Sequence, residues 1–198
     1  AVALGYRTTA DADYSVAIGQ RASTNGHAGA IVLSDGSTTD STQASANNQF
    51  TGRAAGGVRL FTNATMTVGV QVAAGGSSWV VISDRNRKQD FLSVDGEDIL
   101  ARLRLVPVTT WRYRDEADRS TLHIGPMAQD WHRAFGFTTD DRTINMSDFD
   151  GVNLAAIQAL ARRTDALQAE NAALRDQNRQ LEARLARLEA AVEGGRRP

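Results

Sequence analysis

Apolar residues recur with a heptad period in the last quarter of the chain. Leucines lie seven residues apart from Leu160 to Leu188, and the positions three before each leucine complete an a/d pattern. A seam of five heptads is typical of a left-handed coiled coil, which we expect over residues 151–193, before a polar tail at 194–198. The seam positions expected at the interface are Ile157, Leu160, Thr164, Leu167, Asn171, Leu174, Asn178, Leu181, Leu185 and Leu188.

The seam carries signals for two oligomeric states. Asn171 and Asn178 at core positions fix the register at a cost in stability, and in parallel coiled coils such asparagines favour dimers. The segment Arg184–Glu189 has the Arg-apolar-x-x-apolar-Glu spacing associated with trimers. Opposite charges such as Glu170 and Arg175 suit pairing between chains. We expect a parallel homotrimer, with a dimer as the alternative.

The first part of the chain contains a sequence repeat. Val2–Arg7 recurs as Val16–Arg21, a step of 14 residues, and a third partial copy begins near Ala30. Small residues and a glycine at fixed phase predict short strands that stack as coils of a β-roll over residues 1–33. Two to three coils are not stable alone. We therefore expect the segment to continue upstream, to pack against other chains, or both. An opening Ala1 in place of Met favours a fragment of a longer chain.

The middle of the chain combines β signals with turns. Three stretches have the alternation or the continuous apolar run of strands: 57–62, 66–72 and Trp79–Ile82. The last is expected to be a buried strand that ends at Ser83, and the polar stretch 37–48 is expected to be a loop. Residues 34–82 are therefore predicted to be the β-rich end of a stem.

Helix and strand signals alternate over residues 83–150. The expected elements are a helix at 97–104, a strand at 108–113 paired with 121–125, and a helix from Pro126 to Phe135. The core of this small α+β domain is too small to be stable without partners. The fold class predicted for the chain is α+β, in an elongated modular homotrimer.

Composition narrows the classes of function. The 198 residues include 17 glycines, and 41% of them are hydrophobic, which favours modules in series over a single compact core. A net charge of −1 implies no general attraction to nucleic acid or to anionic membranes. The absence of cysteine excludes disulfides and thiolate chemistry, and no apolar run approaches the roughly 20 residues that span a bilayer.

The sequence offers few candidates for metal or cofactor binding. His27, His123 and His132 lie on separate segments without the spacing of a zinc site. Asp148–Gly151 is similar to part of a calcium loop, but we expect it to cap a helix that starts near Val152. We expect no metal and no cofactor.

A serine and a lysine lie five residues apart where the β-rich region ends. The segment Ser83–Lys88 is also typical of a solvated turn, so the pair alone does not establish a site. A spacing of five places two side chains on opposite faces of a strand and about 140° apart on an α-helix. Either the chain turns sharply within Asp84–Arg87, or Lys88 acts on the serine of a neighbouring protomer.

Three segments, taken in order, resemble one protein family. They are Ser83–Lys88, Ile124–Asp130, and Asp150–Leu160 leading into the heptads. Together they resemble the intramolecular chaperone auto-processing domain of phage tailspikes and tail fibres, peptidase family S74, from about Trp79 onward. The first 30 residues resemble the head repeats of trimeric autotransporter adhesins, in which an Ala-x-x-Gly unit winds a β-roll shared by three protomers.

The S74 resemblance implies a function and a site. In that family the domain assembles the trimer, helps the β-rich stem to fold, and then cuts itself off. The implied cut lies between Ile82 and Ser83, with Ser83 as nucleophile and Lys88, in its neutral form, as base. The residues of the surrounding motif are Asp84, Arg85, Asn86 and Arg87. The residue before the motif lysine is often apolar in the family, and Arg87 departs from that pattern.

The resemblance also implies partners and a location. The partners are further copies of the chain and its own upstream stem, without nucleic acid or membrane insertion. The stem would belong to a virion tail after assembly in the host cytoplasm, the released domain would be soluble, and a prophage or bacterial surface origin is an alternative. The competing function is a trimeric surface adhesin stalk without proteolysis. A coiled-coil DNA-binding protein would need a basic region before the heptads, which this chain lacks.

Overall fold

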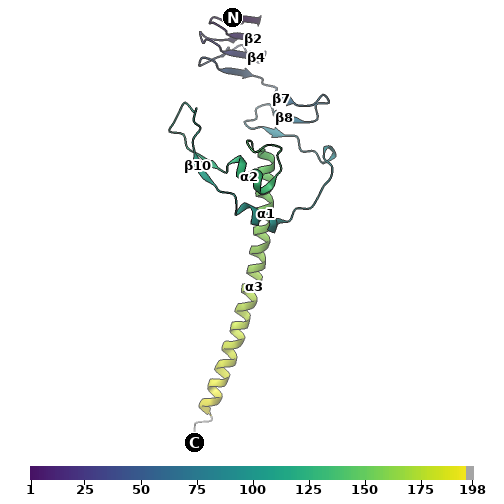
Figure 1. The fold of residues 1–198 in the computed structure, drawn as a ribbon, viewed down its shortest axis with the longest axis vertical. Helices are drawn as coiled ribbons and strands as arrows, with labels where there is room; N and C mark the ends of the chain where they lie inside the picture. The colour runs from purple at the N-terminus through teal and green to yellow at the C-terminus, as the bar shows by residue number, and fades with distance from the viewer. Residues whose placement is uncertain (195–198) are drawn as a thin grey trace. The chain divides into compact units, whose positions relative to one another are not determined.

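The computed structural model describes residues 1–194, which combine α and β structure (Figure 1). They fall into two compact units, Ala1–Asp90 and the residues from Phe91 onward. The domain limits predicted from the sequence stay predictions.

The first unit opens with a stack of parallel strands, of which Figure 1 labels β2 and β4. One sheet has the order β1 (Val2–Tyr6), β2 (Val16–Gln20), β4 (Ile31–Ser34) and β6 (Phe50–Arg53). A second parallel pair joins β3 (Ala22–Ser23) to β5 (Thr42–Gln43), a short strand inside the stretch predicted as a loop. Val2 lies opposite Val16, so the 14-residue repeat sets the register of the first two coils, as predicted.

Small side chains fill the interior of this stack. Its buried cluster consists of Ala17, Ala22, Ala30, Val32 and Ala44. The repeated glycines let neighbouring coils approach closely. Gly19 has a φ of +109°, and a Cβ atom added there would lie 1.9 Å from the carbonyl oxygen of Ser34. A side chain at this phase of the repeat is therefore incompatible with the stack.

Hydrogen bonds to Asp35 stabilise the last coils of the stack. The Asp35 carboxylate accepts hydrogen bonds from the Ala55 N–H at 2.6 Å and from Arg53 Nε at 3.0 Å. The bond from Ala55, followed by that from the Ser37 hydroxyl, lowers the pKa of Asp35 to about 2. The ionised carboxylate therefore holds β6 and the chain after it against the end of β4.

A three-stranded antiparallel sheet follows. Its order is β7 (Val58–Phe61), β8 (Gly69–Val72) and β9 (Val80–Val81), and the first two strands confirm the prediction at 57–62 and 66–72. The prediction that Trp79–Ile82 is buried was wrong. Val80 and Val81 are about half exposed, at 48% and 50%. The reason is that β9 is an edge strand of a sheet in which no residue is fully buried.

The second unit packs two short helices against the start of a long one. The helices are α1 (Gly96–Leu103), α2 (Ala128–Phe135) and α3 (Met146–Gly194), and β10 (Thr109–Trp111) pairs antiparallel with β11 (His123–Gly125). These elements confirm the helices and the hairpin predicted for residues 97–135. The buried cluster comprises Ile99, Leu100, Val106, Trp131, Phe135, Val152, Ala156 and Ala159.

The long helix begins earlier than predicted. We expected a start near Val152 with Asp148–Gly151 as the cap, but α3 starts at Met146. The Asn145 side chain accepts a hydrogen bond from the Ser147 N–H at 2.9 Å, which is the usual role of an N-cap asparagine. Asp148–Gly151 therefore lies inside the first turns of the helix.

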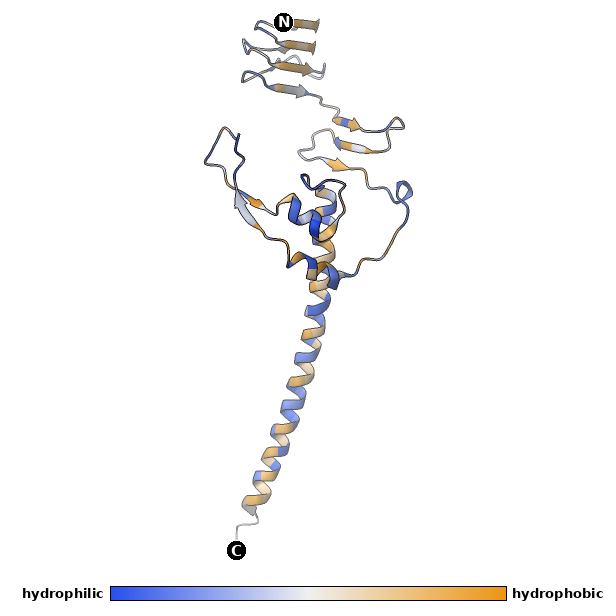
Figure 2. Ribbon diagram, viewed as in Figure 1, coloured by the Kyte–Doolittle hydropathy of each residue, from blue (hydrophilic) through white to orange (hydrophobic). Residues whose placement is uncertain are grey.

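The heptad seam of α3 is uncovered within one chain. Leu160, Leu174 and Leu188 are 50%, 48% and 57% exposed, and Figure 2 shows apolar and polar residues alternating along the helix. None of the described helices is both long enough and apolar enough to cross a membrane. Of the predicted tail, residues 195–198 lie outside the described part of the chain.

Candidate active site

The peptide bond between Ile82 and Ser83 lies where a paired strand becomes a turn. The Ile82 N–H donates to the Gly69 carbonyl at 3.4 Å, which extends the pairing of β9 with β8 by one residue. Ile82 is half-buried, whereas Ser83 is exposed. The sheet therefore holds the residue before this bond, and the residue after it is open to solvent.

A short 3₁₀ helix, η1 (Arg85–Arg87), reverses the chain directly after Ser83. The Arg87 N–H donates to the Asp84 carbonyl at 3.0 Å, and the Lys88 N–H donates to the Arg85 carbonyl at 3.2 Å. These are the i to i+3 bonds of a 3₁₀ turn, which is tighter than an α-helix. The tight turn returns the chain toward Ser83 within five residues.

The turn brings Ser83 and Lys88 into contact within one chain. Lys88 Nζ donates to Ser83 Oγ at 2.6 Å. A spacing of five cannot form this contact in a straight strand or a regular α-helix, and the structure has the sharp turn within Asp84–Arg87 that the sequence offered as one of two routes. A neighbouring protomer is not needed for the contact itself.

Lys88 is the one lysine in the sequence, beside 21 arginines. The difference matters because an arginine stays protonated in proteins, whereas a lysine amine can lose its proton and act as a base. Among the lysine and arginine side chains, the one able to do this is therefore the one against the serine hydroxyl. This count is a second signal for Lys88 in the sequence, beside the Ser83–Lys88 motif.

The site is rich in positive charge. Arg85 and Arg87 lie between Ser83 and Lys88 in the sequence, and the one acid of the turn, Asp84, lies 3.9 Å from Arg87 in a half-exposed and therefore weak ion pair. Arg87, the residue that departs from the family pattern, is exposed, and so is Lys88.

Asp84 and Asn86 have a role that the sequence did not assign. Asp84 Oδ1 accepts hydrogen bonds from the backbone N–H and the side-chain amide of Asn86, at 2.9 Å and 3.1 Å. An aspartate that binds the N–H two residues later is a common way to start a turn. That pattern in the sequence was the signal for this turn.

The comparisons with known proteins match two segments of the chain. Residues 83–138 match the family model of the chaperone of endosialidase, peptidase family S74. Both resemblances seen in the sequence are thereby confirmed, because residues 1–22 match two copies of the YadA head domain repeat. The S74 segment begins at Ser83, the first residue of the turn. No curated protein matches the chain.

His27, His123 and His132 lie on three separate segments of the chain. His123 stacks on Trp111 with ring centroids 4.6 Å apart, and its Nε2 lies 3.1 Å from Glu116. These contacts join the two strands of the β10–β11 hairpin to the loop between them. No group of three metal-binding side chains occurs among the described residues.

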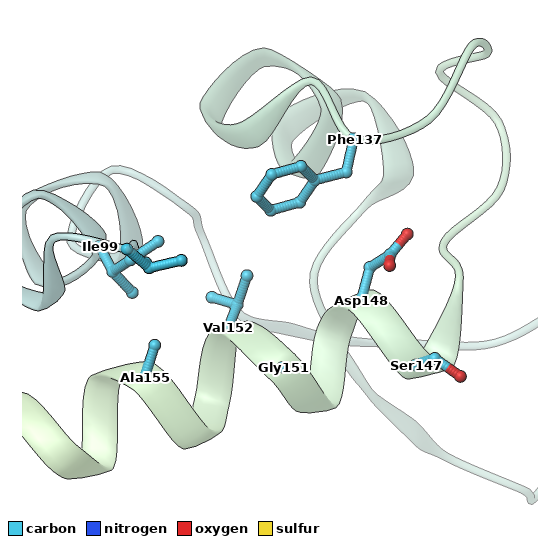
Figure 3. A pocket seen from close by; sticks show the side chains of 8 residues that line it. Ile99, Phe137, Ser147, Asp148, Gly151, Val152 and Ala155 are labelled. Carbon is cyan, nitrogen blue, oxygen red and sulfur yellow. The ribbon is translucent and has the colours of Figure 1, made fainter. Parts of the chain in front are cut away.

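The second unit contains a cavity of about 250 Å³ beside the start of α3. Its apolar wall includes Ile99, Phe137 and Val152, whose side chains point toward one another in Figure 3. Ser147 and Asp148 are the polar side chains at its edge. This hollow is mainly a gap in apolar packing, and Ser83 with Lys88 is the better candidate for chemistry.

Proposed function

We propose that the chain is the C-terminal intramolecular chaperone of a trimeric protein resembling a tail fibre or tailspike, and that it cuts itself between Ile82 and Ser83. The observation that carries this proposal is the 2.6 Å contact between Lys88 Nζ and Ser83 Oγ, at the first residue of the S74 segment.

The geometry of this pair supports the following reaction. Ser83 Oγ attacks the Ile82 carbonyl carbon while the neutral Lys88 amine takes the hydroxyl proton. The Ile82–Ser83 peptide bond then breaks, and the ammonium of Lys88 returns the proton to the departing Ser83 nitrogen. The product is an ester between Ile82 and Ser83 Oγ. Water opens this ester, which leaves a carboxylate on Ile82 and restores the serine hydroxyl.

The trimeric state draws support from both ends of the chain. The uncovered leucines of α3 need partner helices, and the repeats at residues 1–22 match a head domain whose relatives are trimeric adhesins. A coiled coil that gathers three chains raises their local concentration and fixes their register. Strands that are far apart in the sequence or belong to different chains pair slowly, and their unpaired edges stay exposed until they do. Gathering the three chains early therefore helps the repetitive β structure to fold.

Self-cleavage would make the assembly irreversible. After the cut, the stem no longer carries the coiled coil that helped its chains to meet. An unfolded stem then refolds poorly, so its stability becomes kinetic. We place the stem in a virion tail and the released domain in solution, with a prophage or a bacterial surface as the other origin.

The second candidate function is a trimeric adhesin stalk that is never cut. The match of residues 1–22 to the YadA head repeat favours it. The two functions differ in one observable, because a stalk keeps its full length in every variant.

Substitutions in the dyad test the proposal. Ser83→Ala and Lys88→Arg are expected to form trimers that stay full length on a denaturing gel, because Arg keeps the charge of Lys but cannot accept the proton. Ser93→Ala, at another exposed serine, is the matched control and should be cut like the wild type. A product ending at Ile82 in the Ser83→Ala chain would exclude Ser83 as nucleophile.

Mixed trimers test where the lysine comes from. Chains with Ser83→Ala are co-expressed in equal amounts with chains carrying Lys88→Ala, so that most trimers hold both kinds. Because the contact forms within one chain, we expect these trimers to stay uncut. Cutting of the Lys88→Ala chain would show that a neighbour supplies the base.

A further inference from the structure

The contact between Ser83 and Lys88 depends on a turn that has little else to hold it. An extended chain would separate the two Cα atoms by about 17 Å, far beyond the reach of the two side chains. No residue of η1 is buried. Short 3₁₀ turns are also unstable by themselves, since their first hydrogen bonds fix several residues at once. Local hydrogen bonds must therefore contribute much of the stability of this turn.

Most of these local hydrogen bonds are accepted by Asp84. Its side chain accepts from the N–H and the amide of Asn86, and its carbonyl accepts from the Arg87 N–H. The charge of Asp84 contributes less, because its ion pair with Arg87 is long and half-exposed. What the turn uses is an acceptor oxygen at the capping position.

We propose that Asp84 is a positioning residue for the self-cleavage reaction: its cap on η1 holds the turn that places Lys88 Nζ against Ser83 Oγ. The inference rests on the proposed function. It differs from a catalytic role, because Asp84 acts on the turn and not on the reacting atoms. It predicts that any side chain with a capping oxygen at position 84 supports the cut.

The test follows the rate of self-cleavage of the full chain during cell-free synthesis, with intact mass as the readout. We expect Asp84→Ala to slow the cut about five-fold, the population change that follows from losing a typical N-cap. Asp84→Asn and Asp84→Ser are expected within about two-fold of the wild type, because Asn, Asp and Ser cap about equally well. This rescue separates an oxygen cap from a requirement for charge.

Asp95→Ala is the matched control. Asp95 caps α1 in the same way, accepting from the Glu97 N–H at 2.8 Å, but it lies outside the Ser83–Lys88 turn. We expect this variant to be cut at the wild-type rate. Native mass spectrometry shows for every variant whether trimers form, so a defect in assembly is not mistaken for a slow cut.

Three results would overturn the inference: Asp84→Ala cut as fast as the wild type, Asp84→Asn as slow as Asp84→Ala, or Asp95→Ala equally slow. If Asp84→Ala does not assemble, Asn86→Asp replaces it. This variant keeps Asp84 and sets a second carboxylate against it, so an unchanged rate would also overturn the inference. Failure of the proposed function looks different, because the wild type itself would then stay uncut.

Discussion

The uncovered seam of α3 leads to a quantitative prediction about assembly. Leu174 lies in the middle of the seam and is 48% exposed within one chain. Burying a whole leucine side chain is worth about 2 kcal/mol, so covering the exposed half contributes about 1 kcal/mol per chain and about 3 kcal/mol per trimer. Leu174→Ala loses this term and leaves cavities besides, which together weaken the trimer by roughly 3–5 kcal/mol.

Such a loss lowers the association constant by about two to four orders of magnitude. Sedimentation equilibrium on full-length Ser83→Ala chains, with and without Leu174→Ala, measures it. Gln180→Ala is the control, because Gln180 lies on the helix but outside the a/d seam, and it should leave assembly unchanged. If Leu174→Ala assembles as tightly as its parent, the seam is not the interface. If the parent sediments as a dimer, the trimer is wrong.

Three further predictions concern the folded units. Gly19→Ala should disrupt the parallel stack, because its Cβ would meet the Ser34 carbonyl, whereas Gly26→Ala should cost only about 1 kcal/mol of backbone strain; circular dichroism melts compare the two. Trp131 is 1% exposed, so Trp131→Ala should lower the free energy of unfolding by about 3–5 kcal/mol. Chemical denaturation of the Ser83→Ala chain, with and without this change, measures the difference. Asp35 has a pKa lowered to about 2, so its stabilisation is present above about pH 4 and lost as the pH falls toward 2. Asp35→Asn should flatten this acid dependence in thermal melts.

Periodic features of the chain were predictable from the sequence. A step of 14 residues between Val2 and Val16 sets the register of β1 on β2, and the heptads set the long helix. The later coils were harder to predict, because β4 follows β2 by 15 residues and β6 follows β4 by 19, so no fixed period continues. β3 and β5, with two residues each, are too short to show any alternation.

Features that depend on tertiary context escaped prediction. The apolar run Trp79–Ile82 has the composition of a buried strand, but burial depends on what covers the sheet, which the run itself does not encode. The start of α3 was missed because Asn145 caps six residues before the expected position, and Gly151 inside the helix resembled a boundary.

The candidate site was predictable as a pair but not as a geometry. Spacing alone excluded a contact of Ser83 with Lys88 in a strand or an α-helix, and left two routes. The choice between them depends on three local hydrogen bonds around Asp84, which are properties of the folded turn. The signals present in the sequence were an aspartate two residues before Asn86 and the single lysine among many arginines.

The most direct test of self-cleavage is the intact mass of the purified wild-type protein beside that of the Ser83→Ala chain. We expect two wild-type fragments that meet between Ile82 and Ser83, and one full-length mass for the variant. A wild-type protein of full length, or fragments that meet at another bond, would contradict this expectation.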